Sequence, residues 1–545
     1  MKKEKIYIFA ILVLGFLLRT YNIDWDQGAH LHPDERFLTM VGIAISLPKN
    51  ILDYFNVDIS TFNPANVDYK FFVYGTLPIF LNKIVALILG NDNYTSFTIQ
   101  GRFLSALADT LTILLTYKIC QLLEKRYNFS LNIKYVAAFL YALAVFPIQL
   151  SHFFAVDTFL NLFAFSSVYF SLSYFVKKET RYIVLSGIAF GAAIGSKISG
   201  VFILPLILFF LLDLSHAKHL GKLSNSIKNL IIFSSVSFVI LKITNPYIFA
   251  QGITSFMPNQ LFLENIKTLS FLSSKDSFYP PNLQWLSKSP IIFPLSNFAF
   301  FGLGVTYFLT FLFGMFVSLK TRAKFIFAAI ILWIFIFFLY QGGQTVTTMR
   351  YFISLYPFAA IFSAIGIVKL SEKAGKKIAI LTLIIISAWT VFFMSIYTNP
   401  HTRVEASRWI IKNIPAQSVI LSEYWDDALP VFGFENYKII QLSVFDPDSF
   451  EKWEKMNSSL FQGNYLILSS NRGWGSIPLL REEYPLTTKF YEDLFAGKLA
   501  YKKIAEFTSY PSLKYLGIPI TLPDTSAEEA FSVYDHPTVY IFKKN

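Results

Sequence analysis

The chain has 545 residues, of which 54% are hydrophobic and 18% aromatic, and its mean hydropathy is +0.48. A soluble globular protein does not need so much apolar surface, and long continuous apolar runs exclude a β-barrel, so the composition indicates a polytopic α-helical membrane protein. The net charge of +12 lies mainly in short loops between apolar runs, which is the positive-inside pattern and gives no reason to expect nucleic acid. The single Cys120 excludes an intrachain disulfide framework.

The apolar runs predict about eleven transmembrane helices, with the N-terminus inside and the C-terminus outside. The first run follows a basic N-terminus, but no small-residue cleavage site follows it, so we expect an uncleaved helix. Each loop expected inside is basic, as in 118–134 and 218–228. The expected spans are 6–18, 103–122, 135–150, 158–176, 182–195, 199–212, 230–247, 298–318, 325–340, 351–368 and 378–397.

Residues 1–399 are therefore expected to form a transmembrane domain with two large outer loops, 21–100 and 248–297. The apolar segment Leu77–Leu89 within the first loop is shorter than the ~20 residues needed to cross a bilayer, so we predict an interfacial helix there. If this segment crossed, the strongest basic loop would face outward, against the positive-inside rule.

Residues 400–545 have the composition of a soluble domain, and we predict a small extracytoplasmic α/β domain. An amphipathic helix is expected over Arg403–Asn413, because Pro415 follows it as a stop signal. Short apolar runs predict four strands, at 418–422, 437–442, 465–469 and 538–542.

Ionisable residues gather at the outer ends of the expected spans. The carboxylates are Asp34, Glu35 and Asp157, and the cations are Arg102, Lys197 and Arg350. A carboxylate can take the proton from an acceptor hydroxyl as it attacks a sugar's anomeric carbon, while Lys and Arg hold a lipid phosphate. Because that phosphate leaves readily without an acid, a single inverting displacement needs only one base. The pattern indicates transfer chemistry on a charged lipid headgroup.

Structural explanations stay open for most of these residues. Arg102 and Arg350 are equally well explained as side chains that snorkel from span ends. Lys197 is harder to explain in this way, because it lies in a run of small and apolar residues. Asp157 also suits the N-cap of the fourth span, and Asp34 with Glu35 suits the cap of a helix that begins near Arg36.

Four residues of the first outer loop offer a metal site as an alternative to a solvated loop. Their spacings, Asp24-x-Asp26 and His30-x-His32, can hold a divalent ion, although such short repeats also arise by chance. We do not expect a required cofactor.

The sequence resembles the bacterial family 39-type membrane glycosyltransferases of the GT-C superfamily. This group includes relatives of protein O-mannosyltransferases and of the aminoarabinose transferase that acts on lipid A. The resemblance covers essentially the whole chain and rests on the order and spacing of several motifs. These are His32–Phe37, Val73–Pro78, Pro147–Thr158, Ser196-Lys197, Met349–Phe352, His401–Arg403, Glu423–Asp427 and Tyr534–Pro537. Where the aminoarabinose enzyme has a Lys-Pro-Pro element, this chain has Tyr74–Pro78, so no role carries over to that element.

The resemblance implies a GT-C fold and an inverting glycosyltransferase at the cell membrane. It would transfer a sugar from a polyprenyl-phosphate donor to an extracytoplasmic lipid, glycan or protein. By analogy, Asp34 is the base with Glu35 beside it, Asp157 is a second acidic residue, and Lys197, Arg350 and Arg102 bind the donor phosphate. His152, Tyr351 and Tyr74 are expected as further substrate contacts. The alternatives are a lipid or polysaccharide transporter or flippase, and a metal-dependent enzyme similar to oligosaccharyltransferases.

Overall fold

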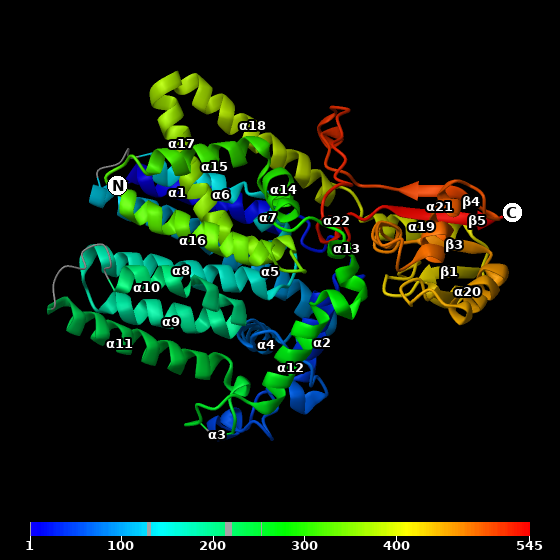
Figure 1. Cartoon of the computed structure of the whole chain (residues 1–545), viewed down its shortest axis with the longest axis horizontal. Helices are drawn as coiled ribbons and strands as arrows, with labels where there is room; N and C mark the ends of the chain where they lie inside the picture. Colours follow the sequence, from blue (N-terminus) through cyan, green and yellow to red (C-terminus); the bar gives the residue numbers. More distant parts are fainter. Residues whose placement is uncertain (1, 128–131, 213–220, 252) are drawn as a thin grey trace.

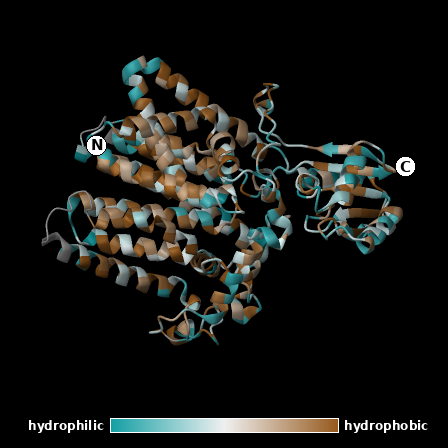
Figure 2. Ribbon diagram, in the orientation of Figure 1, coloured by the Kyte–Doolittle hydropathy of each residue, from teal (hydrophilic) through white to brown (hydrophobic). Residues whose placement is uncertain are grey.

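A computed structural model of the chain describes residues 2–127, 132–212, 221–251 and 253–545. Figure 1 shows a body of long helices that run side by side, with a small sheet domain at one end of the body. Figure 2 shows that apolar residues dominate the helices of the body, whereas the sheet domain mixes polar and apolar residues. Parts of the two basic loops named above, 128–131 and 218–220, lie outside the described residues.

The helices of the body follow the expected spans in order. They are α1 (Lys2–Thr20), α5 (Tyr94–Tyr127), α6 (Ile133–Ala142), α7 (Val145–Ser151), α8 (Val156–Lys177), α9 (Arg181–Ser196), α10 (Leu204–Leu211), α11 (Gly221–Thr244), α15 (Val305–Ser318), α16 (Lys324–Gly342), α17 (Tyr356–Ala374) and α18 (Lys376–Met394). Within the described residues, six helices are long and apolar enough to cross a membrane, or up to eight if each of two bent pairs is one span.

Several expected spans are broken or shorter than the sequence suggests. The third is split into α6 and α7, which meet at 53°. The sixth begins as the 3₁₀ helix η2 (Ile198–Ile203) before α10. The eighth begins as a π-helix, η7 (Asn297–Leu303), which meets α15 at 109° across Gly304. Helix breaks at membrane depth free backbone groups and are tolerated where protein surrounds them, and η2 lies close to residues of the candidate site.

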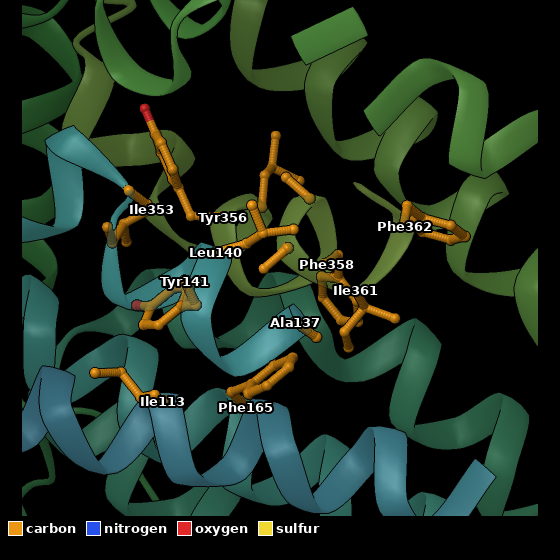
Figure 3. Close-up of a cluster of buried hydrophobic side chains, with 14 of the residues drawn as sticks. Ile113, Ala137, Leu140, Tyr141, Phe165, Ile353, Tyr356, Phe358, Ile361 and Phe362 are labelled. Carbon is orange, nitrogen blue, oxygen red and sulfur yellow. The ribbon is translucent and has the colours of Figure 1, made fainter. Parts of the chain in front are cut away.

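The body has one main apolar core between α5, α6, α8 and α17. Figure 3 shows Ile113, Leu140, Tyr141, Phe165 and Phe358 from these four helices pointing toward one another. Leu140 and Tyr141 are fully buried, and the other three are at most 2% exposed. This packing holds in place α8, which carries Asp157, and the start of α17, which directly follows η8 with Arg350 and Tyr351.

Short helices cover the end of the body that faces the sheet domain. They are α2 (Pro33–Ala44), α3 (Ile51–Phe55), η1 (Pro64–Val67), α4 (Leu77–Leu89), η4 (Pro246–Ile248), α12 (Gln260–Leu272), η5 (Lys275–Ser277), η6 (Pro280–Asn282), α13 (Leu283–Leu286), α14 (Ile292–Ser296), η8 (Met349–Leu355) and η9 (Ser395–Thr398). The interfacial helix expected over Leu77–Leu89 is present as α4 with the same bounds. Gly90 ends it in a left-handed conformation, which is a common helix stop.

The C-terminal domain is a five-stranded mixed sheet in the order β2-β1-β3-β5-β4. The strands are β1 (Val419–Glu423), β2 (Lys438–Leu442), β3 (Tyr465–Leu468), β4 (Tyr501–Phe507) and β5 (Val539–Lys544). β1 pairs in parallel with β2 and β3, and β5 is antiparallel to β3 and β4. The domain's helices are α19 (Thr402–Asn413), η10 (Phe434–Asn436), α20 (Phe450–Gln462), η11 (Ile477–Leu479), α21 (Pro485–Phe495), η12 (Lys514–Leu516) and α22 (Glu529–Ser532).

Four of the five strands match the sequence prediction, and β4 has no counterpart in it. β4 is an edge strand whose residues 502–504 are all exposed, so it lacks a continuous apolar run. Charged residues on edge strands are a common way to prevent pairing with another chain. They also remove the pattern by which a strand is recognised in a sequence.

Candidate functional site

Asp34 and Glu35 occupy the first turn of α2, where the helix dipole favours negative charge. The helix begins at Pro33, and its N-cap is His32, whose Nδ1 accepts a hydrogen bond of 3.3 Å from the Glu35 backbone N–H. Burial lowers the pKa of His32 to about 4, which keeps the ring neutral and able to accept. The expected capping role of Asp34 and Glu35 is therefore wrong, and their carboxylates are free to make other contacts.

Glu35 points into a fully buried clamp built on Arg102. Its carboxylate accepts two hydrogen bonds from the Arg102 guanidinium, at 2.6 and 2.9 Å, and one of 2.8 Å from the Phe154 backbone N–H. Asp26 accepts two more hydrogen bonds from the same guanidinium, at 2.7 and 3.0 Å. The Trp25 ring covers this guanidinium, with its centre 4.8 Å away.

Arg102 does not lie at the end of a span, because the helix that carries it begins before the apolar run. α5 begins at Tyr94, two turns earlier, so Arg102 lies within the helix and is fully buried. A guanidinium held by two carboxylates and covered by an aromatic ring has little capacity left for a lipid phosphate. The geometry favours a structural role for Arg102 and Glu35 over the predicted roles in phosphate binding and catalysis.

Asp34 points the other way and forms an ion pair with Arg350 at the start of η8. Both side chains keep about a quarter of their surface exposed, at 24% and 28%. Burial alone would raise the pKa of the Asp34 carboxyl, but the charge of Arg350 outweighs this and holds that pKa below its usual range. Asp34 is therefore ionised and partly accessible.

A second ion pair, Asp157 with Lys197 at 2.7 Å, lies beside the first. Asp157 sits in the first turn of α8, whose N-cap is Ala155, so the alternative explanation of Asp157 as an N-cap is wrong. Lys197 ends α9 in an extended conformation, and its ammonium lies 4.8 Å from the centre of the Tyr351 ring. Since Tyr351 follows Arg350, the two pairs share one wall.

Arg350 of the first pair and both members of the second pair line a cavity of 210 Å³ between α8, η2, α16 and η8. Asp157, Lys197, Arg350, Tyr351 and Tyr74 line its polar part. Its remaining wall is largely apolar, with Leu160, Ala164, Ile203, Trp333 and Phe337. The cavity therefore joins two cations to a surface that suits a hydrocarbon chain.

Gly75 brings Tyr74 to this cavity. Its backbone N–H donates a hydrogen bond of 3.1 Å to the Ser196 carbonyl, next to Lys197. A Cβ at this position would lie 2.1 Å from the Gly195 carbonyl oxygen, so only glycine fits here. The segment before α4 thus packs directly against the end of α9.

The other predicted substrate contact, His152, does not line the cavity. Its ring stacks on Tyr397 at 3.8 Å, and its two nitrogens lie 2.8 and 3.1 Å from the carbonyls of Ile148 and Tyr21. It is fully buried, so its role in the structure is packing.

The four residues considered as metal ligands each have a different partner. Asp24 accepts from the Gly28 N–H at 2.9 Å, and Asp26 belongs to the clamp. The His30 ring packs against Tyr94, and His32 caps α2 between two aromatic rings. Within the part of the chain that the structure describes, no group of three or more His, Cys, Asp or Glu side chains is arranged to hold a metal ion.

Residues of the C-terminal domain contact the site from outside the body. Glu528, which is 2% exposed, accepts hydrogen bonds from the Thr348 hydroxyl at 2.8 Å and the Met349 N–H at 3.0 Å, one residue before Arg350. Burial raises the pKa of this carboxyl to about 7, although both hydrogen bonds act in the opposite direction. The structure thus links the sheet domain to the backbone that carries Arg350.

A further link joins α2 to the loop that follows β1 of the sheet domain. Arg36 donates to Asp427 at 2.7 Å, and Arg403 holds Asp426 at 2.6 Å and Asp427 at 2.7 Å. In the sequence, Glu423–Asp427 and Tyr534–Pro537 stand out only as motifs, and no contact could be predicted for them. Glu528 could not be singled out, because one glutamate in a polar loop carries no sequence signal.

Comparisons with known proteins agree with this architecture. Residues 77–243 match the family described as dolichyl-phosphate-mannose-protein mannosyltransferase. No match was found among curated proteins.

Among solved structures, the chain is similar to the oligosaccharyltransferase of Archaeoglobus fulgidus in complex with zinc and sulfate, with a TM-score of 0.54 at 15% identity. The match covers 99% of this chain and 88% of that one. A second structure of this enzyme, AglB with an inhibitory peptide and a dolichol-phosphate, has a TM-score of 0.54 at 13% identity and covers 99% and 89%. ArnT from Cupriavidus metallidurans has a TM-score of 0.50 at 11% identity and covers 99% and 98%.

At these identities the structural matches establish the fold. They confirm the predicted GT-C architecture, a helical membrane body followed by a C-terminal domain that here contains the sheet. The chain has the GT-C fold shared by AglB and ArnT, and its residues 77–243 carry the sequence pattern of the dolichyl-phosphate-mannose-protein mannosyltransferase family.

Proposed function

We propose that this protein is a membrane glycosyltransferase that moves a sugar from a polyprenyl-phosphate donor to an extracytoplasmic acceptor. The observation that carries the proposal is the cavity, whose lining combines Lys197 and Arg350 with a largely apolar wall. A polyprenyl phosphate needs the same combination, two cations for its phosphate and an apolar surface for its chain. The match to a mannosyltransferase family and the dolichol-phosphate in the AglB complex agree with this donor class.

In the proposed reaction Asp34 is the general base. The acceptor hydroxyl attacks the anomeric carbon, and Asp34 takes the hydroxyl proton. The bond between that carbon and the phosphate oxygen breaks, and the polyprenyl phosphate leaves with the electron pair, stabilised by Lys197 and Arg350. One displacement of this kind inverts the anomeric centre.

Because Asp34 is paired with Arg350, binding of the donor also changes the basicity of Asp34. While Arg350 neutralises Asp34, the carboxylate is a weak base, because a lowered pKa means a lower proton affinity. A donor phosphate that attracts Arg350 competes with Asp34 for the guanidinium and raises the basicity of Asp34. In the same way, the donor phosphate competes with Asp157 for the Lys197 ammonium. The base therefore gains strength when the donor is bound.

Vesicles that contain the full-length protein test the proposal. They are loaded with labelled polyprenyl-phosphate sugars and mixed with envelope lipids, glycans and proteins, and label is followed into the three acceptor fractions. We expect transfer into one fraction and polyprenyl-phosphate binding that is about ten- to a hundredfold weaker in Lys197→Met, since a charged hydrogen bond contributes about 1.5–3 kcal/mol. Lys412→Met, at an exposed position of α19, is the matched control. Equal binding by both variants would contradict the proposed donor site.

A metal-dependent enzyme similar to oligosaccharyltransferases is a second candidate, because the AglB fold matches with a TM-score of 0.54. The same vesicles assayed in a metal chelator distinguish the two candidates. Activity lost in the chelator and restored by a divalent ion supports the second, and full activity in the chelator supports the first. A transporter is less well supported, since the two ion pairs lie together at one end of the helical body and are not spread along a path.

A further inference from the structure

A hairpin projects from the sheet domain between β4 and β5. Figure 1 shows it rising toward the top of the view beside the end of α18, away from the sheet. An isolated bridge joins Ser512 to Thr521. The Leu513 N–H donates to the Ile520 carbonyl at 2.9 Å, and the Leu522 N–H donates to the Pro511 carbonyl at 2.8 Å. Gly517 forms the turn with a φ of +79°. The hairpin is thus an ordered element that pairs its own backbone.

The side chains of this hairpin are unusually apolar for an exposed segment. Five large apolar residues within eight positions are exposed: Tyr515, Leu516, Ile518, Ile520 and Leu522, at 39 to 55%. Elsewhere in the described part of the sheet domain, no stretch of eight residues exposes more than two large apolar side chains, and a few exposed apolar residues are normal on a protein surface. A cluster of this kind indicates a contact surface.

The base of the hairpin is fixed to the end of a candidate membrane span. The Ser512 N–H donates to the Phe392 carbonyl at 3.1 Å, and the Tyr515 hydroxyl donates to the Val391 carbonyl at 2.9 Å. Both acceptors lie in the last turn of α18. The hairpin is therefore held at the level where this helix ends.

The apolar surface of the hairpin continues onto the helical body. α18 itself exposes Ile380, Leu381, Ile384 and Ile385, as a helix in contact with lipid does. Between α18 and η7 lies an apolar groove of 360 Å³, lined by Phe300, Phe301, Trp389, Phe392, Leu522 and Pro523. Leu522 and Pro523 at the base of the hairpin thus form part of the same surface.

We propose that the hairpin 510–522 inserts its apolar side chains into the lipid bilayer surface beside α18. Lipid suits this surface better than a protein partner, because the surface is continuous with lipid-facing residues of α18. The paired backbone leaves few polar groups to desolvate. Tyr515 and the neighbouring Lys514 are of types that favour the membrane–water boundary, where a flexible ammonium reaches water and a tyrosine hydroxyl finds a polar partner, here the Val391 carbonyl. The contact anchors the sheet domain to the membrane.

Site-specific fluorescence tests this contact without any assay of sugar transfer. Cys120, the only cysteine, is replaced by alanine, and single cysteines are introduced as Leu516→Cys or Ile520→Cys for labelling with nitrobenzoxadiazole. The full chain is reconstituted into phosphatidylcholine–phosphatidylglycerol vesicles with or without brominated acyl chains. We expect both labels to be quenched at least twofold by the brominated lipid.

Two further positions calibrate the measurement. A label at Ile384→Cys, on the exposed side of α18, reports a lipid-facing site, and a label at Phe450→Cys reports an exposed apolar site of the sheet domain. Labels at 516 and 520 that behave like the one at 384 support the proposal. Labels that stay unquenched, like the one at 450, overturn it. Labels shielded from lipid and sensitive to protein concentration indicate a second copy of the chain instead, and also overturn it.

Discussion

Asp34 and Glu35 are neighbours in the chain, but they lie in opposite environments. Glu35 is fully buried, and its two oxygens accept three hydrogen bonds from Arg102 and Phe154. Asp34 is one quarter exposed and pairs with Arg350, which lines the cavity. A carboxylate whose bonds are all satisfied inside protein stabilises a fold, whereas one that shares a single cation near a cavity can exchange partners. The comparison assigns a structural role to Glu35 and a chemical role to its neighbour Asp34.

The comparison is tested most strongly by Asp34→Asn. This change keeps the shape of the side chain and removes its ability to take a proton. We expect turnover to fall about 10²- to 10⁴-fold, the usual contribution of a general base. The thermal stability of the purified protein should stay within about 1 kcal/mol of wild type, because the pair is partly exposed. Asp446→Asn, at an exposed position of the sheet domain, is the matched control. Turnover like that of wild type would rule out Asp34 as the base.

Glu35→Gln is expected to have the reverse effect. It leaves the buried Arg102 guanidinium with Asp26 as its only carboxylate partner. Removing one partner of a buried ion pair costs about 3 kcal/mol or more, so the melting temperature in detergent should fall by several degrees. Activity per folded molecule should change far less than in Asp34→Asn. Glu435→Gln, an exposed change, controls for loss of charge. An unchanged melting temperature with lost turnover would assign catalysis to Glu35.

Much of the fold could be predicted from the sequence, because apolar runs and helix stops act locally. α4 has the predicted bounds, and four strands lie where short apolar runs occur. The pairing of carboxylates could not be predicted. Asp34 and Arg350 are 316 residues apart, and which neighbour in the Asp34-Glu35 pair faces Arg102 depends on the rotation of α2. Tertiary packing sets that rotation, and no local sequence pattern predicts it.

The histidines show the same limit. His30-x-His32 has a spacing that metal sites use, yet His32 serves as a helix cap and His30 packs on Tyr94.

Arg102 was expected at a span end, because the apolar run begins at Phe103. The helix itself begins at Tyr94, in the preceding polar segment, and carries Arg102 into the protein. Hydropathy marks the apolar part of a helix but not its full length.

A second buried charge cluster, around His536, makes the stability of the fold depend on pH and so offers another test of buried charges as structural groups. His536 lies between Asp524 and Asp535, with nitrogen–oxygen distances of 2.8 and 2.5 Å. Burial alone would lower the pKa of His536, but the two carboxylates raise it from 6.5 to about 10. The charged ring therefore stabilises the fold fully below pH 6.5, and this stability is lost as the pH rises toward 10.

The variant His536→Asn should lose about 2 kcal/mol at pH 6, as expected for a charged hydrogen bond. Its stability should then vary less than that of wild type between pH 6.5 and 10. Thermal unfolding at several pH values measures both quantities. Parallel pH curves for the two proteins would show that the ring carries no charge that matters to folding.

Glu528 tests whether the site depends on the sheet domain, and its expected effect is the smallest. Its carboxylate holds the backbone at Met349, so Glu528→Ala should reduce kcat/KM about tenfold, which corresponds to about 1.4 kcal/mol. Glu528→Gln keeps an acceptor oxygen and should retain most activity.

The pH profile distinguishes positioning by Glu528 from simple packing. Since the pKa of Glu528 is about 7, its carboxylate loses charge below that pH and becomes a weaker acceptor for Thr348 and Met349. Wild-type activity should therefore decline below pH 7, and the decline should be shallower in Glu528→Gln, which does not titrate. Identical profiles for the two proteins, with equal loss in Glu528→Ala at every pH, would reduce Glu528 to a packing contact and leave Arg350 positioned by the body alone.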